Sequence, residues 1–454
     1  MKRMLFLYSL SLVALFLSCR PGSWSGYTGK APPAAPAPVI RGVNEGEIAE
    51  GRKTIVLVGA TLLDGRGGEP VADAIVVVEG NKIMAVGKRG EIDLPAGAEV
   101  VEAAGLFLLP GLIDAHFHLD GIAKLPNDFL RNGITSLRDP GEWIEYYEAE
   151  RAAGYPLPRL FLTGPHLDMP PAAHPKHSVL IRDPDEAVRQ VHKLADQGAS
   201  AIKIYYRLSL GVMAAICEAA HARGLPVTAH LEISDVREVI KAGVDGIEHV
   251  TSLGLSLLPG PEAKQYRQAV LADNNARKNG RYAVWNTLNL NSKKVDSLLF
   301  LFKDRQTFLC PTLAAFEYRL GAGKEDTVQA NGFRNMLALV GKAHRAGVRV
   351  VVGSHSMVPY AEKGWAFHQE MELLAESGMP PAAIIIAATL ENARFFRVEN
   401  RLGSIERGKV ADLVLVRENP LADIRALRQV ERVMLNGVWL TGEEGIVWRR
   451  LLLL

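Results

Sequence analysis

Two patterns of hydrophobic and polar residues follow one another along the chain and divide it into parts. In residues 53–110, runs rich in β-branched residues (KTIVLVGATLLDG, AIVVVEGNKIMAVG, AEVVEAAGLFLLPG) are separated by Gly, Asn and Asp turns, which is typical of β-strands. The chain from residue 404 has the same pattern in KVADLVLVREN and VERVMLNGVWL. Because unpaired strand edges are a liability, we predict that residues 53–110 and 404–454 form one small β-sandwich.

Residues 111–403 have a different pattern, in which short strand-like runs alternate with amphipathic helices such as DPDEAVRQVHKLADQG. The runs are LIDAHFH, ITSLRD, RLFLTGP, AIKIYY, PVTAHL, GIEHV, TFLCPTLA and VRVVVGSH. Eightfold alternation of strand and helix predicts an α/β fold, a TIM-like (β/α)₈ barrel. The stretch 258–291 after the sixth run is interpreted as a lid or an oligomer contact, and the oligomeric state stays open.

The first 19 residues have the composition of an export signal. Two basic residues precede an apolar stretch that is too short to span a bilayer. The stretch ends in LFLSC, which resembles a bacterial lipobox with Ser18 at the cleavage position. We therefore expect residues 1–19 to be a lipoprotein signal peptide and Cys19 to be lipidated. The alternative is an ordinary secretory signal with a chance cysteine.

Residues 20–52 are predicted to be a flexible linker. Pro, Ala, Gly and Ser dominate its first part, and it shows no hydrophobic period. Arg20, rather than Asp, follows the cysteine, which is similar to lipoproteins sent to the outer membrane of two-membrane bacteria. The expected location is the bacterial cell envelope, where a lipid on Cys19 attaches the protein to a membrane and the linker holds the folded part away from it.

Charge and cysteine content narrow the possible functions. Lys and Arg number 52 against 50 for Asp and Glu, so there is no basic field to drive nucleic-acid binding and we exclude that class. Besides Cys19, the chain has Cys217 in a helical pattern and Cys310 in a strand pattern. One disulfide is arithmetically possible, but we expect both to be small buried hydrophobic residues.

The chemistry is expected at the C-terminal ends of the barrel strands. His116 and His118 are two residues apart on the first strand, so both side chains lie on one face and can bind a metal. His230 and His249 close the fifth and sixth strands and should be neighbours in space. Lys203, on the fourth strand, faces the interior and needs either an ion-pair partner or a lowered pKa. A neutral amine of this kind can form a carbamate that bridges two metals.

These stretches resemble the amidohydrolase superfamily, in its imidazolonepropionase and Xaa-Pro dipeptidase-like branch, from about residue 53 to the end. The matching segments are PGLIDAHFH, GITSLRDPG, IKI, VTAH, AGVDGIEH and AATLENARFFRVENRLGSIERGKVADLVL. The resemblance implies that His116 and His118 hold one divalent metal, that His230 and His249 hold a second, and that carbamylated Lys203 bridges them. On imidazole-rich ligands we expect zinc, with one or two ions per chain.

One position departs from that family, whose eighth strand usually ends in an aspartate. Here the strand reads VRVVVGSHSM, and His355 stands in its place, facing inward with Val351 and Gly353. Three interpretations stay open: His355 does the aspartate's work, as in relatives with a GxH strand and a later H-x-E motif (His368 to Glu370 here); metal occupancy is altered; or the site only binds.

Further residues are candidates for the surroundings of the site. His174, in the loop GPHLDMPPAAHPKH, is expected to polarise a substrate carbonyl, or else is a surface histidine, and Tyr205 is expected to contact substrate. Arg138 and Asp139 at the end of the second strand are interpreted as an ion pair behind the ligands.

The expected activity is hydrolysis of a C–N bond in a small amide, cyclic amide or dipeptide by metal-activated water. Three rival functions remain. The first is other hydrolase chemistry, namely deamination, lactone opening or phosphotriester cleavage. The second is an altered or inactive lipoprotein that binds a small ligand, since His355 replaces the aspartate. The third is a structural envelope protein.

Overall fold

A computed structural model describes residues 40–321, 323 and 325–440. The predicted signal peptide with Cys19, most of the predicted linker and residues 441–454 lie outside the described residues. Among the helices that are described, none combines the length and apolar character needed to cross a bilayer.

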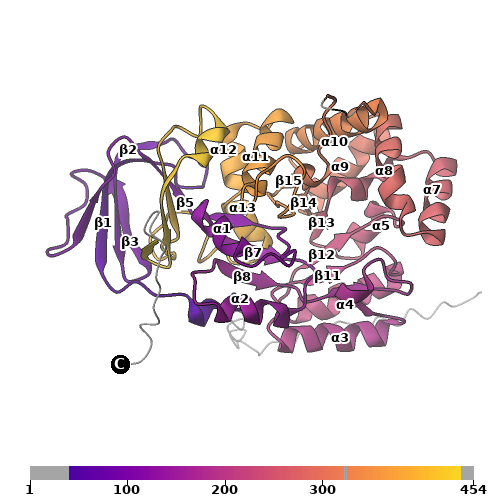
Figure 1. Cartoon of the computed structure of the whole chain (residues 1–454), viewed down its shortest axis with the longest axis horizontal. Helices are drawn as coiled ribbons and strands as arrows, with labels where there is room; N and C mark the ends of the chain where they lie inside the picture. The colour runs from indigo at the N-terminus through magenta and orange to yellow at the C-terminus, as the bar shows by residue number, and fades with distance from the viewer. Residues whose placement is uncertain (1–39, 322, 324, 441–454) are drawn as a thin grey trace, which may run out of the picture. The chain divides into compact units, whose positions relative to one another are not determined.

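The two ends of the described chain contribute strands to one sheet (Figure 1). Its strands are β1 (Thr54–Leu62), β2 (Val71–Glu79), β3 (Lys82–Lys88), β4 (Glu99–Glu102), β5 (Phe107–Pro110), β16 (Leu413–Val416), β17 (Val430–Leu435) and β18 (Val438–Leu440). The order is β18-β17-β16-β5-β1-β2-β3, with β4 beside β1. β5 and β16 pair antiparallel, so that Leu109 lies opposite Val414.

These strands form one sheet that bends back on itself, instead of the two separate sheets that a sandwich implies. The amide of Ile83 in β3 donates to the carbonyl of Lys409, just before β16, at 2.9 Å. This links an edge strand to the middle of the strand order. The bend encloses a small core that includes Leu57, Val76 and Leu413.

All eight predicted strand runs of the central part contain a parallel strand. They are β6 (Leu112–Asp114), β7 (Ile134–Asp139), β8 (Arg159–Leu162), β11 (Ile202–Ile204), β12 (Val227–His230), β13 (Gly246–Glu248), β14 (Phe308–Cys310) and β15 (Arg349–Val350). These strands belong to two sheets, one containing β6 to β8 and the other containing β11 to β15. Within each sheet, strands that follow one another in the chain are hydrogen-bonded neighbours. The short strands β9 (His166–Asp168) and β10 (Ser178–Leu180), which were not predicted, extend the second sheet beyond β11.

Hydrogen bonds also bridge the two seams between these sheets. Ser200, before β11, donates to Leu162 in β8 at 2.8 Å, and Ala115, after β6, donates to Val352, after β15, at 3.0 Å. Strands paired in chain order with both seams bridged have the connectivity that a (β/α)₈ barrel requires.

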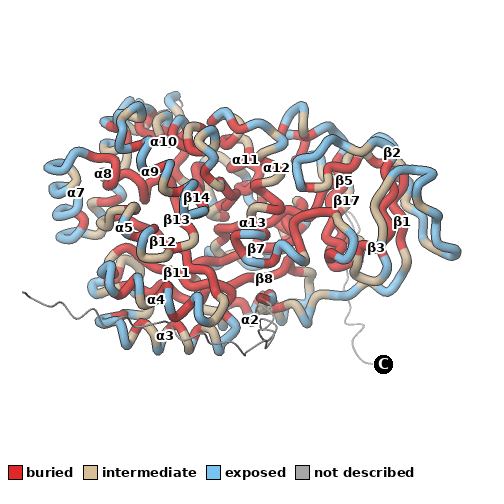
Figure 2. Tube along the Cα trace, turned by 180° about the vertical axis from the view of Figure 1, so that it is seen from behind, coloured by how far each residue is buried: buried red, intermediate tan, exposed pale blue. Residues whose placement is uncertain are grey.

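Helices follow most of these strands and lie outside them, as the burial pattern in Figure 2 shows. Those before β13 are α1 (Leu125–Arg131), α2 (Glu148–Ala152), α3 (Pro184–Asp196), α4 (Leu210–Ala222) and α5 (Val236–Lys241). The later ones are α6 (Gly254–Leu257), α7 (Gly260–Ala272), α8 (Ala276–Thr287), α9 (Lys293–Asp304), α10 (Thr327–Arg345), α11 (Ala366–Glu376), α12 (Pro381–Ala387) and α13 (Leu390–Phe395).

Helix α3 shows how the sequence sets these elements. The Asp183 side chain caps it by accepting from the amide of Glu186, and Pro184 occupies the first position, where its missing amide is not needed. Its buried residues, Ala187, Val191 and Leu194, recur at the helical period and face the strands.

The end of the predicted linker is wrong, because residues 40–52 pack on the folded part. Ile40 is buried, Val43 donates to the carbonyl of Leu160 at 2.7 Å, and Glu45 forms a 2.8 Å salt bridge with Arg401. The segment carries too few apolar residues to show a period, and its order comes from contacts with distant residues.

The prediction for the cysteines is confirmed. Cys217 in α4 and Cys310 in β14 are both buried, and neither forms a disulfide within the described residues. They pack as small apolar side chains in the main core.

Candidate active site

A cavity of about 720 Å³ opens at the C-terminal ends of the parallel strands. The site residues predicted from sequence, apart from Cys19, all line it: His116, His118, His174, Lys203, Tyr205, His230, His249 and His355. The strand order therefore brings residues that are up to about 240 positions apart in the chain into one cavity.

The histidines form a tight cluster. Ring centroids lie 4.6 Å apart for His116 and His249, 4.4 Å for His230 and His249, and 4.9 Å for His118 and His355. Ring nitrogens of His116, His249 and His355 all lie within 4.8 Å of one another. Imidazole nitrogens at this spacing can converge on one divalent ion with modest side-chain adjustment.

The ring of His116 is oriented by a buried carboxylate. Its Nδ1 lies 2.7 Å from Oε2 of Glu248, so that Nε2 faces the cluster, 3.1 Å from Nε2 of His118. Glu248 also accepts hydrogen bonds from Arg138 Nη2 at 2.7 Å and from Thr228 Oγ1 at 2.5 Å. All four side chains are buried.

The predicted ion pair between Arg138 and Asp139 does not form. These neighbours in β7 point to opposite sides, as strand periodicity requires, so Arg138 reaches Glu248 instead. Asp139 places Oδ1 3.4 Å from Nδ1 of His118 and lines the cavity. It thus brings a negative charge next to the histidine cluster.

Two of the histidines adopt a backbone conformation that is rare outside glycine. His249 has φ of 66° and His355 has φ of 60°. Such residues cost on the order of 1–3 kcal/mol each and persist where surrounding contacts hold them. The amide of His249 donates to the Cys310 carbonyl at 2.8 Å, its Nδ1 lies 2.7 Å from Thr312 Oγ1, and the amide of His355 donates to the His116 carbonyl at 2.6 Å.

Lys203 is a buried amine without a partner. Its side chain is 1% exposed, and within the described residues its Nζ has no hydrogen bond. Burial lowers the pKa of Lys203 to about 8, so a substantial fraction is neutral near pH 7.5. The ion pair considered as the alternative is absent among the described residues. An unpartnered, partly neutral amine beside the histidines fits a carbamate that binds metal.

Four histidines of the cluster, His116, His230, His249 and His355, are held in the metal-binding, neutral form, whereas the pKa of His118 is raised because its hydrogen bond to Asp139 and the charge of that carboxylate outweigh burial. Burial lowers the pKa of His116, His230 and His249 well below the usual value, and burial followed by the charge of His118 lowers the pKa of His355 to about 3. Near pH 7 these imidazoles carry no positive charge that would repel a cation.

Several residues of the cavity were missed by sequence reasoning, among them His166 and Arg277. His166 in β9 is buried and stacks on Tyr205 at 4.5 Å between centroids. It directly follows the third strand run, so the rule that selected His230 could have found it. Arg277, in the stretch 258–291, donates from Nη2 to Nε2 of His174 at 3.1 Å. That stretch therefore supplies part of the cavity wall.

The H-x-E motif lies away from this cavity. Nε2 of His368 bonds the carbonyl of Leu427 at 3.2 Å, and Glu370 accepts from the amide of Ala314 at 2.7 Å. Neither side chain lines the cavity, so within the described residues they support α11 and its neighbours, not the histidine cluster.

Glu370 makes stability depend on pH. Burial raises the pKa of Glu370 to about 8, above the 4.5 of a free glutamate, so the folded state binds this proton more tightly than the unfolded state. Ionisation of Glu370 therefore destabilises the folded state. This loss of stability is absent below pH 4.5 and grows as pH rises to about 8. We expect Glu370→Gln to gain on the order of 3 kcal/mol in unfolding free energy relative to the parent between pH 5 and 8. Urea unfolding across this range measures it, and parallel pH profiles would contradict it.

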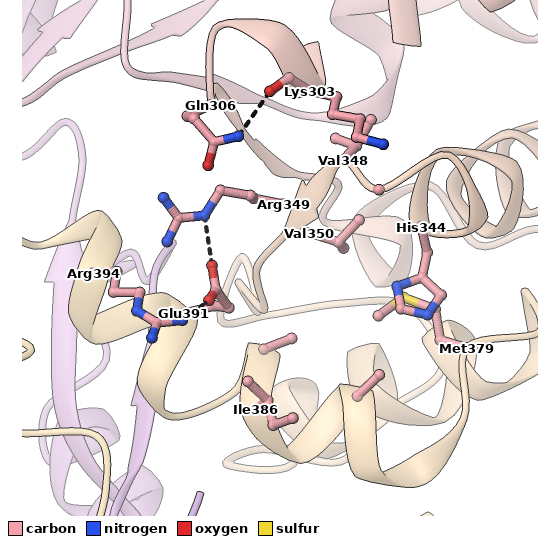
Figure 3. A pocket seen from close by; sticks show the side chains of 13 residues that line it. Lys303, Gln306, His344, Val348, Arg349, Val350, Met379, Ile386, Glu391 and Arg394 are labelled. Atoms are coloured by element: carbon pink, nitrogen blue, oxygen red, sulfur yellow. Dashed lines mark hydrogen bonds and ion pairs between the residues drawn. The ribbon is translucent and has the colours of Figure 1, made fainter. Parts of the chain in front are cut away.

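A second pocket, of about 570 Å³, lies at the opposite ends of the strands (Figure 3). Two of its cations already share one carboxylate: Arg349 Nε donates to Glu391 at 2.7 Å, and Arg394 binds the same group. In the described residues it holds His344 but no histidine cluster. The chemistry-bearing residues therefore gather at the C-terminal ends.

The sequence model of the amidohydrolase family matches residues 107–440. The chain belongs to the amidohydrolase family. The match covers the strands that carry the histidine cluster and the C-terminal strands of the shared sheet.

Several known proteins are similar to this amidohydrolase. A putative prolidase from Bifidobacterium longum has a TM-score of 0.67 and 27% identity, over 86% of this chain and 94% of that one. A Xaa-Pro dipeptidase with bound methionine has the same fold, with a TM-score of 0.65 and 22% identity over 86% and 100% of the two chains. The adenine deaminase of Leuconostoc mesenteroides subsp. mesenteroides is 22% identical over 83% of this chain, which spans 58% of that relative.

A shorter stretch of the amidohydrolase resembles a deacylase more closely. The N-acyl-D-aspartate deacylase of Alcaligenes xylosoxydans xylosoxydans is 40% identical over 92 residues, which are 20% of this chain and 18% of that protein. The chain thus matches less than two thirds of the length of these curated relatives. These comparisons establish a hydrolase family and leave the substrate open.

Proposed function

We propose that this amidohydrolase hydrolyses a carbon–nitrogen bond in a small amide, cyclic amide or dipeptide, using a divalent metal held by the histidine cluster. The observation that carries the proposal is the convergence of His116, His249 and His355 within 4.8 Å beside the unpartnered amine of Lys203. Relatives named prolidase and N-acyl-D-aspartate deacylase support this class of bond. We interpret the parallel strands as a (β/α)₈ barrel that carries the site.

The metal ligands would be His116 and His118 on one side, His230 and His249 on the other, and carbamylated Lys203 between them. A divalent ion supplies polarisation of the substrate carbonyl and lowers the pKa of nearby water. Zinc suits the imidazole-rich set. Because His355 brings no negative charge, the carbamate and Asp139 beside His118 would supply negative charge to balance the cations.

His355 is the proposed general base. Its imidazole faces the cluster, stacked 5.4 Å from His116, and it is neutral near pH 7. It can accept a proton from the attacking water and pass it to the leaving nitrogen.

His174 and Tyr205 are proposed to hold the substrate. Burial, followed by the charge of Arg277, lowers the pKa of His174 to about 4, so its ring is neutral. Because Arg277 is always a donor, Nε2 of His174 must accept, and the ring proton lies on Nδ1. His174 can therefore donate a hydrogen bond to a carbonyl oxygen.

Metal counting tests this arrangement. For the chain from Gly22 onward, loaded with zinc in the presence of bicarbonate, we expect mass spectrometry to find two ions per chain, and one in Lys203→Ala. The reason is that only a carbamate gives Lys203 oxygen ligands for a second ion. One ion in the parent would point to a mononuclear site with His355 as base. No ion in the parent would favour the alternative, a lipoprotein that binds a ligand without hydrolysing it.

We also propose that the protein is anchored in the bacterial envelope by a lipid on Cys19. The support is the leader sequence, with its apolar stretch and LFLSC ending. We expect Cys19→Ser to move the protein from the membrane fraction to the soluble fraction. Retention of the variant in the membrane would exclude lipid anchoring through this residue.

A further inference from the structure

The cavity has a cationic wall formed by one helix. Arg277, Lys278 and Arg281 of α8 all line it, together with Phe316. The wall lies next to the histidines through aromatic contacts: the ring of Phe316 is 5.7 Å from His249 and 5.0 Å from Cζ of Arg281. A substrate over the cluster would therefore extend towards these cations.

Arg277 is fixed and only partly neutralised. It is 4% exposed, donates to His174, and lies 5.9 Å from the ring of Tyr205. Its nearest carboxylate, Glu232, is 3.9 Å from Nη1, at the limit of a salt bridge. Within the described chain its buried Nε has no hydrogen-bond partner. A buried guanidinium with an unused donor calls for a further acceptor.

Arg281, one helical turn later, has its charge open to the cavity. Its Nε donates only weakly, at 3.4 Å, to the carbonyl of Arg277. Among the described residues no carboxylate lies within salt-bridge distance of Arg281, whereas Arg277 in the same wall has Glu232 at 3.9 Å. The half-buried guanidinium is thus available to bind an anion from the substrate.

We propose that Arg281, with Arg277 behind it, binds a free carboxylate of the substrate. The substrates would then be dipeptides or N-acyl amino acids with a free α-carboxylate, rather than neutral cyclic amides or nucleobases. Only the ring of Phe316 lies between Arg281 and His249 of the cluster. In a dipeptide or an N-acyl amino acid, the α-carboxylate lies only a few bonds from the amide that would be cleaved. This inference rests on the proposed function, because it concerns the same cavity.

The test compares acids with matched amides. Xaa-Pro dipeptides and N-acetyl amino acids, each paired with its C-terminal carboxamide, are titrated by calorimetry into the full chain after metal removal, and their hydrolysis is measured after zinc loading. We expect acids to bind at least about tenfold tighter than amides, since hydrogen bonds between charged groups contribute about 1.5–3 kcal/mol. Arg281→Met should weaken the binding of the acids about ten- to hundredfold, with the effect on hydrolysis mainly in KM. Binding and hydrolysis of the carboxamides should stay unchanged.

Two further variants make the result specific. Arg281→Lys should keep part of the preference for acids, because it retains the charge but not the planar fork. Arg267→Met, an exposed residue of α7 outside the cavity, should keep all of it. Equal binding of acids and amides, or no binding of any acid, overturns the inference. If acids bind preferentially but the loaded protein hydrolyses none of the amide bonds, the proposed function fails and the carboxylate site stands.

Discussion

His249→Ala is expected to lose its divalent metal and to lose hydrolysis by about a thousandfold or more. His249 lies centrally in the cluster, with ring centroids 4.6 Å from His116 and 4.4 Å from His230. Metal ions contribute several kcal/mol to transition-state stabilisation, and each 1.36 kcal/mol is tenfold in rate. Mass spectrometry of the intact protein and a rate assay measure the two losses together.

The controls separate loss of a ligand from loss of the fold. His192→Ala, on α3 and outside the cavity, should keep metal and activity. Thr312→Val removes the hydroxyl 2.7 Å from His249 Nδ1 and should weaken metal binding about 10- to 100-fold without abolishing it. Full hydrolysis by His249→Ala with an unchanged unfolding profile would rule out the proposed ligand set.

The second large effect is expected at His355. Loss of a general base typically lowers the rate by about 10²–10⁴, so His355→Ala should fall by that factor in kcat. If His355 acts as base only, the variant keeps its metal; if it is also a ligand of the triad with His116 and His249, its metal content falls too. Parallel measurement of kcat and bound metal distinguishes the two roles.

His355→Asp provides the matched comparison. An aspartate adds the negative charge and the base that the family resemblance leads us to expect there, so the variant should remain active. Activity that appears only in His355→Asp, and is absent from the parent, would favour the ligand-binding alternative. If both the parent and His355→Asp are active, histidine and aspartate can each serve as the base at this position.

The convergence of these side chains in one cavity was predictable from the sequence, because the ends of the parallel strands determine where the side chains lie. His116, His118, His230 and Lys203 follow from two rules: side chains alternate along a strand, and parallel strands present the same end to one side. Neither rule needs the shape of loops. For the same reason the chain order of the parallel strands was predictable, while the bend of the shared sheet was not, because it depends on hydrogen bonds between residues about 325 positions apart.

Glu248 shows why the rest was hidden. It directly precedes His249, so strict alternation places the two side chains on opposite faces. The φ of 66° at His249 breaks that alternation and lets both enter the interior, where Glu248 orients His116. Backbone conformations of this kind are set by tertiary contacts. Arg277 and Arg281 were missed because the path of the stretch 258–291 has no local signature.

The pairing of β5 with β16 has a consequence for how the protein is made. Leu109 meets Val414 only after some 300 further residues have been synthesised, which takes roughly 15–60 s at about 5–20 residues per second. Throughout that time the nascent chain holds β1 to β5 with an unoccupied apolar edge. The first part of the chain to leave the ribosome must therefore wait for nearly the last before it can finish folding.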